Sequence, residues 1–322
     1  MLLMANACYL SFADEWVQKA DMPTARADLA ICVLNDKIIA FGGSNKVGPL
    51  ANVEEYDPIT DKWTKSKDMP TSKAAHQICL VNGKVYIISN VFTPTSVVEY
   101  DPLKDTYTGK EDMPTARMWP SACTINGLIY VFSGTMGNGA EKPNVEEYNP
   151  SKDEWKKKKD MPVAREGFSA NVVKDKIYII GGWTPNQFLA TTEVYDPIAD
   201  KWENKSPMPT ARTYFASCVV NDKIYVIGGN RDFGTAISTV EVYDPATDTW
   251  EKKADMKIAR CNHSAIEIKG KIYVIGGSPS FIMLFPNEPL SSVEEYDTGF
   301  TPKAVNYIGK LSSTWGSIKS IR

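Results

Sequence analysis

Hydrophobic and polar positions repeat along this chain with a period close to 47 residues. Six short apolar runs, such as residues 225–229 (YVIGG) and 130–134 (YVFSG), end in glycine or another small residue. Their fourth positions are residues 42, 89, 133, 181, 228 and 276, which gives intervals of 47, 44, 48, 47 and 48. A period this regular over most of a chain indicates stacked supersecondary units.

Each unit predicts four short strands. A first apolar run, such as residues 29–34 (LAICVL), is followed by a two-residue turn such as residues 221–222 (ND), whose residues tolerate the left-handed angles of a tight hairpin. The second run is rich in Ile, Val and Tyr, as in a strand buried on both faces. A third run (VEEY or similar) leads through an Asp-Pro turn to a fourth that carries Trp or Tyr. Six such units predict an all-β fold, a six-bladed β-propeller.

The two ends of the chain are expected to share the last blade. Residues 14–16 (DEW) repeat the pattern of residues 153–155 (DEW), whereas no aromatic residue completes the unit after Asp297. An N-terminal strand that closes the last blade would remove the free sheet edges. We therefore expect residues 1–13 to be an N-terminal tail or signal remnant, 14–297 the propeller, and 298–322 a C-terminal tail packed on it.

The glycine pairs, the tyrosine of the third run and the tryptophan of the fourth resemble kelch repeats, and they do so in register over nearly the whole of residues 14–297. The second unit departs from the pattern at Ser89 and Asn90, and the third at Ser133. The chain resembles free-standing kelch proteins of bacterial type, and the resemblance implies a binding scaffold.

Composition narrows the range of partners. The chain has 322 residues and a formal net charge of −3, which argues against nucleic acid as a partner, and no apolar stretch is long enough to span a membrane. Four of the six cysteines occupy equivalent repeat positions, as buried packing residues do, so we expect neither disulfides nor a zinc site. We expect a monomer without cofactor or metal. The compartment stays open between secreted or periplasmic and cytoplasmic.

The variable loops after the glycines and the Met-Pro-x-x-Arg connections should lie on one face of the disc, where binding groups are usually found. One basic residue per unit would form a ring at the channel mouth on that face. The resemblance to kelch domains implies that such a ring attracts anions; the alternative is that each side chain bonds to a neighbouring carbonyl or carboxylate. The candidate ligand-binding residues of this ring are Arg26, Lys73, Arg117, Arg165, Arg212 and Arg260.

Residues next to this ring differ between units, as a binding site requires, although drift at exposed positions would look the same. His76 and His263 share one repeat position, three residues after the basic residue. Either they are structural, or they act with Asp28 and Glu166 as acids and bases near the channel, where histidine titrates close to neutral pH. The remaining candidate ligand-binding residues of this set are Trp119, Phe168, Tyr214 and Asn262.

One loop is unusually apolar. Residues 281–285 (FIMLF) stand where other units have polar loop residues, so they should be buried against the channel mouth, the N-terminal tail or a partner. We favour the first, with Phe281 and Phe285 as a flap over the mouth.

Two functional hypotheses come first. The favoured one is a propeller that engages a protein or a small anionic or sugar-like ligand at the loop face around the central channel. The alternative is a cofactor-free isomerase, lyase or hydrolase at the channel mouth, and a purely structural role in a larger assembly is the third. The fold does not choose among them.

Overall fold

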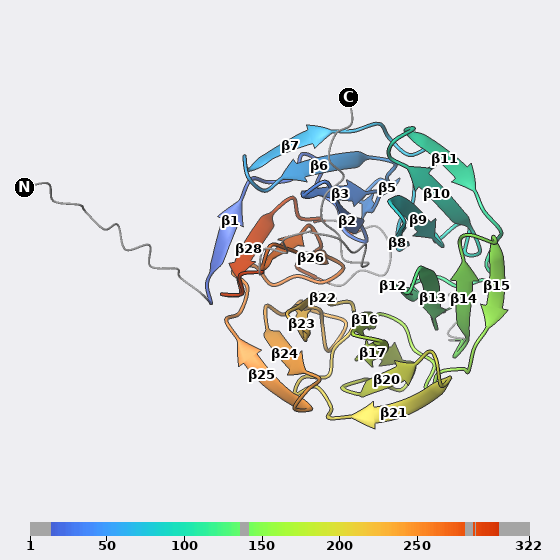
Figure 1. Ribbon diagram of the computed structural model, residues 1–322. Coiled ribbons are helices and arrows are strands. Elements are labelled where there is room, and N and C mark those ends of the chain that lie inside the picture. Colours follow the sequence, from blue (N-terminus) through green and yellow to red (C-terminus); the bar gives the residue numbers. More distant parts are fainter. Residues whose placement is uncertain (1–13, 136–141, 281–285, 287, 303–322) are drawn as a thin grey trace, which may run out of the picture.

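The computed structural model describes residues 14–135, 142–280, 286 and 288–302. Every regular element in this part of the chain is a β-strand, and the strands form six antiparallel four-stranded sheets around a central axis (Figure 1). The predicted six-bladed β-propeller is therefore confirmed. Within the described residues no helix has the length and apolar character needed to cross a membrane.

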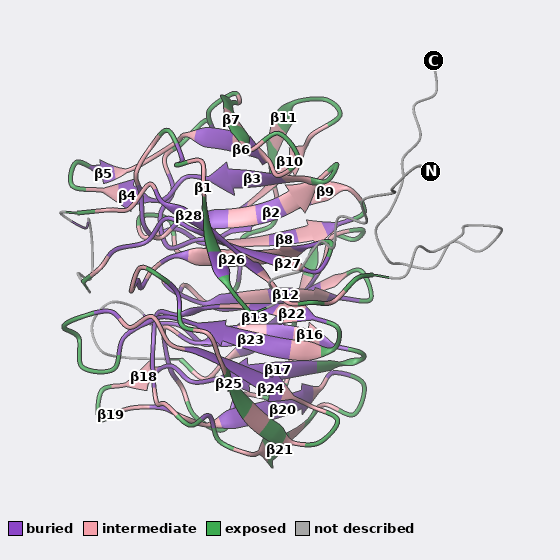
Figure 2. Ribbon diagram, turned by 90° about the vertical axis from the view of Figure 1, so that its left-hand side faces the viewer, coloured by how far each residue is buried: buried purple, intermediate pink, exposed green. Residues whose placement is uncertain are grey.

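Each blade runs from an inner strand beside the axis to an outer strand at the rim. The second strand is almost fully buried between the neighbouring blades, whereas the outer strand is largely exposed (Figure 2). The first three blades consist of β2 (Ala30–Leu34), β3 (Lys37–Phe41), β6 (Val53–Asp57) and β7 (Lys62–Lys65); β8 (Gln77–Val81), β9 (Lys84–Ile88), β10 (Val97–Asp101) and β11 (Thr106–Gly109); and β12 (Ser121–Ile125), β13 (Leu128–Phe132), β14 (Val145–Asn149) and β15 (Glu154–Lys157).

The other three blades follow the same plan, and two short hairpins extend from the loops of blades 1 and 4. These blades consist of β16 (Ser169–Val173), β17 (Lys176–Ile180), β20 (Thr192–Asp196) and β21 (Lys201–Lys205); β22 (Ala216–Val220), β23 (Lys223–Ile227), β24 (Val240–Asp244) and β25 (Thr249–Lys253); and β26 (Ser264–Ile268), β27 (Lys271–Ile275), β28 (Val293–Asp297) and β1 (Trp16–Lys19). The hairpins are β4 (Ser44–Asn45) with β5 (Gly48–Pro49), and β18 (Trp183–Thr184) with β19 (Gln187–Phe188).

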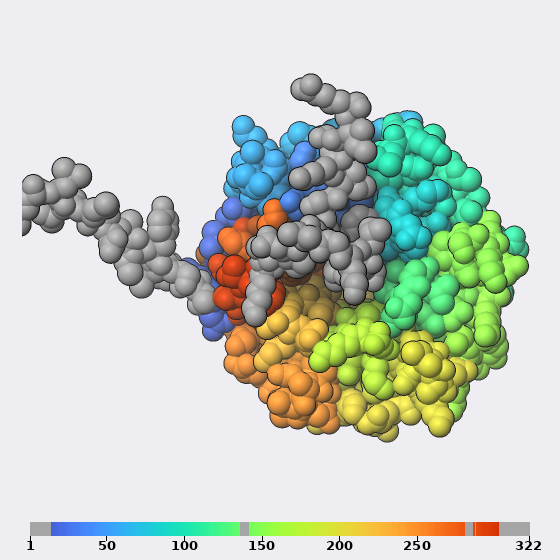
Figure 3. All heavy atoms as spheres, viewed as in Figure 1, coloured from blue at the N-terminus to red at the C-terminus, as the bar shows by residue number. Residues whose placement is uncertain are grey.

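The disc has two different faces. We call the side that carries β4–β5 and β18–β19 the variable-loop face, and it lies on the left in Figure 2. The opposite side carries the two-residue turns and is called the turn face; Figures 1 and 3 look onto it. Asn35 and Asp36 in the first of these turns adopt φ values of 52° and 61°, the left-handed geometry that the sequence predicts for a tight hairpin.

Adjacent blades are held together by a two-point clamp at the rim. In blade 1, the Nε1 of Trp63 donates to the carbonyl oxygen of Ala20, and the amide of Ala20 donates to Oδ1 of Asp61, both at 2.9 Å. Tyr56 donates its hydroxyl to the same Asp61 oxygen, and its ring packs against that of Trp63. The same two hydrogen bonds recur in blades 3, 4 and 5. There the Trp–Asp pair bonds to the backbone of one residue: Trp155 and Asp153 to Glu111, Trp202 and Asp200 to Lys159, and Trp250 and Asp248 to Ser206.

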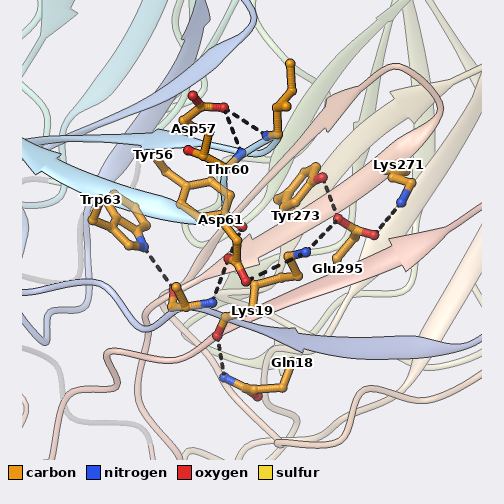
Figure 4. Close-up of polar contacts among 12 residues, drawn as sticks. Gln18, Lys19, Tyr56, Asp57, Thr60, Asp61, Trp63, Lys271, Tyr273 and Glu295 are labelled. Atoms are coloured by element: carbon orange, nitrogen blue, oxygen red, sulfur yellow. Dashed lines mark hydrogen bonds and ion pairs between the residues drawn. The ribbon is translucent and has the colours of Figure 1, made fainter.

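The N-terminal segment makes the same clamp in the last blade. β1 pairs with β28, the Nε1 of Trp16 donates to Ala254 at 2.9 Å, and Asp14 accepts both the Ala254 amide and the Tyr296 hydroxyl. Lys19 of β1 forms ion pairs with Asp61 of blade 1 and Glu295 of blade 6, so it links the first blade to the last (Figure 4). Figure 3 shows the result as a closed ring in which the red end of the propeller meets the blue beginning. The predicted closure is confirmed.

The two tails are described only in part. Thr298 donates to the carbonyl of Gly270, and Phe300 packs against the core between blades 5 and 6. The predicted tail contacts of residues 303–322, like the predicted tail 1–13, lie outside the described residues.

Deleting residues 1–20 should lower the melting temperature strongly, because it removes the clamp of blade 6 and the buried Trp16 together. Loss of a buried Trp alone costs about 3–5 kcal/mol. Thermal unfolding followed by circular dichroism tests this, with deletion of residues 1–13 as the control. Equal melting temperatures for residues 21–322 and the full chain would show that the ring does not depend on this strand.

Candidate functional site

The five arginines of the predicted basic ring are buried inside their own blades. Their side chains are 0 % exposed. Arg165 is typical: its Nη1 donates to the carbonyl of Gly181 at 3.2 Å, and its Nη2 pairs with the carboxylate of Glu193 on the third strand. The other pairs are Arg26 with Glu54, Arg117 with Glu146, Arg212 with Glu241 and Arg260 with Glu294.

Blade 2 replaces both partners of this pair together. Lys73 stands in the place of the arginine and Val98 in the place of the glutamate. Lys73 is 3 % exposed, and its Nζ reaches the Ser96 hydroxyl at 3.4 Å. The arginine and the glutamate are thus replaced together in blade 2, which indicates that the two side chains act as a pair in the other blades.

These side-chain positions contradict the expectation that a basic ring attracts anions at the channel mouth. The six basic side chains are turned into the blades, and in five of them the charge is compensated by a carboxylate 2.8 Å away or less. The alternative interpretation, in which each arginine ties its own blade together through carbonyls and a carboxylate, describes the observed contacts. Planar guanidinium groups suit this buried, multiply bonded role.

The two histidines pack between blades. A Cβ on Gly42 would lie 3.0 Å from Cε1 of His76, and one on Gly228 would lie 2.8 Å from Cε1 of His263, so each imidazole fills the space left by a glycine of the preceding blade. Phe215 occupies the same place against Gly181. The repeat position is therefore a packing position, and glycine is needed opposite these three rings because the approach is so close.

Burial also removes the histidines from the pH range of acid–base catalysis. Desolvation, together with the nearby charges of Lys73 and Arg26, lowers the pKa of His76 to about 3. Burial lowers the pKa of His263 well below its usual value. The expected pairing of an imidazole with Asp28 is not formed, because the carboxylate of Asp28 is hydrogen-bonded to Ser44 and Asn262 instead.

A cavity of about 260 Å³ occupies the central channel and is lined by all six inner strands. At its variable-loop end stand the six residues that come two positions after each basic residue, and all have left-handed φ values of 47–63°. Their backbones bond from blade to blade: the amide of Asp28 donates to Asn262 at 2.8 Å, and that of Asn262 to Tyr214 at 2.9 Å. This ring of residues is Asp28, Ala75, Trp119, Gly167, Tyr214 and Asn262.

Apolar side chains close the channel on the variable-loop face. Trp119, Tyr214 and Ala75 pack with Ala236 of the blade 5 loop, and Val91 of the blade 2 loop lies against them. Tyr214 donates its hydroxyl to Oε1 of the buried Glu166 at 2.8 Å. The structure thus brings Asp28, Trp119, Phe168, Tyr214, Asn262 and both histidines around one cavity, whereas Glu166 lies behind its wall. Phe281 and Phe285, the predicted flap, lie outside the described residues.

A surface patch that sequence reasoning missed lies on the variable-loop face. Phe233 of the blade 5 loop contacts Trp183 and Phe188 of the β18–β19 hairpin, with ring centroids 5.1 and 4.7 Å apart. We call these three residues the aromatic patch. Phe233 is 36 % exposed. The sequence signal that could have predicted this patch is the presence of aromatic residues in the variable loops of two consecutive units.

The described residues contain neither a metal-binding cluster nor a disulfide. No group of three or more His, Cys, Asp or Glu side chains is close enough there to hold a metal ion. The five described cysteines are buried, unpaired thiols.

Comparison with known proteins agrees with this architecture. Residues 104–277, more than half of the chain, match the model of the KLHDC2/KLHL20/DRC7 kelch-repeats domain, and residues 25–70 and 259–300 match that of the kelch motif. The chain belongs to the kelch-repeat family.

This kelch propeller is also similar to a solved structure titled "Structure of YjhT". The TM-score is 0.70 at 14 % sequence identity, over 85 % of this chain and 95 % of that chain. At this identity the likeness concerns the fold alone. No curated protein matches the chain.

In this kelch propeller, removing one member of an internal ion pair should be costly. Arg117→Ala leaves Glu146 buried without its partner, and breaking such a pair costs about 3–5 kcal/mol. The double change Arg117→Lys with Glu146→Val copies blade 2 and should cost less than the sum of the two single changes. Urea denaturation measures Arg117→Ala, the single changes Arg117→Lys and Glu146→Val, and the double variant. Strict additivity would contradict the view that the pair acts as one unit.

Proposed function

We propose that this kelch propeller is a binding module that holds a segment of a partner protein on the variable-loop face, at the aromatic patch. The observation that carries the proposal is the contact of Phe233 with Trp183 and Phe188 at an exposed position. Clustered, partly exposed aromatic rings are the usual anchors of protein interfaces.

The backbone at Phe233 supports this assignment. Its φ is 55°, a left-handed conformation that costs a residue other than glycine about 1–2 kcal/mol. The ring packs against Trp183 and Phe188, and 36 % of the residue stays exposed. Strain of this kind is typical of functional sites, where the fold holds a side chain ready for a partner.

The loop that carries Phe233 is anchored on both sides. The backbone of Asn230 exchanges hydrogen bonds with that of Thr213, and the amide of Ala236 donates to the carbonyl of Pro279 in the next blade. Thr235 and Ser280 form a further bridge. A surface held in place before binding loses less entropy when a partner arrives.

A protein partner fits these contacts better than a small anion at the channel mouth. The arginines that would attract an anion are buried and paired with glutamates, so they present no free charge on this face. The alternative of a cofactor-free enzyme built on His76, His263, Asp28 and Glu166 stays an untested hypothesis. No observed contact favours it, because the imidazoles pack against glycines.

Selection from a random peptide library with the purified protein tests the proposal. We expect the selected peptides to carry apolar residues and to lose at least about tenfold in affinity for Phe233→Ala, that is about 1.4 kcal/mol or more, because the exposed ring is the anchor. Isothermal titration calorimetry gives the affinities.

Two control variants separate the patch from the rest of the surface. Phe92→Ala removes an exposed ring from the blade 2 loop, and Ile198→Ala removes an exposed side chain that follows an Asp-Pro turn of blade 4. Both should bind the peptides like the wild type. If Phe233→Ala and Trp183→Ala bind them unchanged, the aromatic patch is not the site.

A further inference from the structure

The channel cavity carries a negative charge that no described residue neutralises. Of the described residues that line it, Asp28, His76, His263 and Tyr214 can ionise. The histidines stay neutral because burial lowers their pKa values, and Tyr214 stays neutral because burial raises its pKa well above 10. Asp28 is therefore the charged group of this wall at neutral pH.

The carboxylate of Asp28 is fixed by neutral groups. Oδ2 accepts the Ser44 hydroxyl at 3.0 Å, and Oδ1 accepts the side-chain amide of Asn262. Within the part of the chain that the structure describes, no Lys, Arg or His nitrogen lies within salt-bridge distance of it. Five buried arginines elsewhere each have a carboxylate partner, whereas the described partners of the half-buried Asp28 are neutral. Burying a charge without a partner is costly unless a ligand supplies one.

The rest of the wall suits a cation. Trp119, Phe168, Tyr214 and Phe215 line the same cavity, and aromatic faces attract organic cations. The six inner strands pair on one side only, so their other edges face the axis. The cavity of about 260 Å³ has room for several heavy atoms, far more than one metal ion fills.

We propose that the central channel binds a small organic ammonium ion, with its positive nitrogen against Asp28 and its carbon groups against the aromatic wall. The charge of this ligand is opposite to that expected from the basic ring. The side chains at the variable-loop end close the channel there, so the ligand enters from the turn face. The site is independent of the aromatic patch.

Binding should weaken in acid. Burial raises the pKa of Asp28 to about 6, against the hydrogen bonds from Asn262 and Ser44. The other groups that face Asp28 electrostatically, Tyr214 and Cys261, have raised pKa values and stay neutral over this range. Protonation of Asp28 removes the attraction, so affinity should be full above about pH 7 and fall below about pH 6.

Choline and its uncharged isostere 3,3-dimethyl-1-butanol are the probes. Titration calorimetry on the full chain should show saturable binding of choline at pH 7.5, at least about tenfold tighter than binding of the alcohol. Sodium and calcium chloride are titrated separately. Equal affinity for choline and the alcohol, tighter binding of a metal ion than of choline, or no saturable binding of choline, tetramethylammonium or ammonium would overturn the proposal.

Asp28→Asn tests the residue, and Asp36→Asn is the matched control. Asp36 is an exposed carboxylate of the same blade that pairs with Lys269 on the turn face. Asp28→Asn should weaken choline binding at least tenfold, and Asp36→Asn should leave it unchanged. An equal loss of choline affinity in the two variants would show that the net charge of the protein, and not the carboxylate of Asp28, attracts choline. That result would contradict the proposal.

Two further readouts keep the test decisive. If Asp28→Asn does not fold, the pH dependence of choline binding by the wild type replaces it, and constant affinity from pH 7.5 to 5 would contradict the role of Asp28. Peptide binding at the aromatic patch should be the same with and without choline. The two proposals can therefore fail separately.

Discussion

The propeller depends on one repeated interaction, the clamp between the outer strand of a blade and the preceding connection. A single residue of that connection donates its amide to an aspartate and accepts the indole N–H of a tryptophan, as Ala20 does with Asp61 and Trp63. Asp14 and Trp16 act on Ala254 in the same way, although they come from the other end of the chain. Blade 2 departs from this pattern, with Tyr107 in place of the tryptophan. A ring closed in this way holds the loops and the channel in fixed positions.

The buried charges follow a second rule, because each arginine is neutralised inside its own blade. This arrangement stabilises the connection between inner and third strands, and it removes the positive charge expected at the channel mouth. Asp28 then becomes the charge that decides what the cavity can hold. A wall of aromatic rings and one carboxylate has the opposite preference from a ring of exposed arginines.

The period of the repeat made the fold predictable, and the copy of the outer-strand pattern at residues 14–16 made the closure predictable. The direction of the arginine side chains was harder to predict, because a long side chain can reach either the channel or the third strand. The sequence did contain one indication that the arginine pairs with a glutamate of the third strand. In blade 2, Lys73 replaces the arginine and Val98 replaces the first glutamate of the VEEY run. The aromatic patch could not be assembled without the structure, because Phe188 and Phe233 lie in separate repeats and meet only when blades 4 and 5 pack.

Both proposed sites require a rigid ring. The blade that joins the two ends of the chain should therefore not open before the whole propeller unfolds. Native-state hydrogen exchange tests this most directly, by comparing the amides of β27 in the closing blade with those of β17 in blade 4, whose strands are continuous in sequence. If β1 closes the ring as fully as the other clamps do, the slowest amides of both strands exchange with the same free energy, that of global unfolding. Much lower protection in β27 than in β17 would show that the seam opens locally, and would contradict the account of a rigid closed propeller.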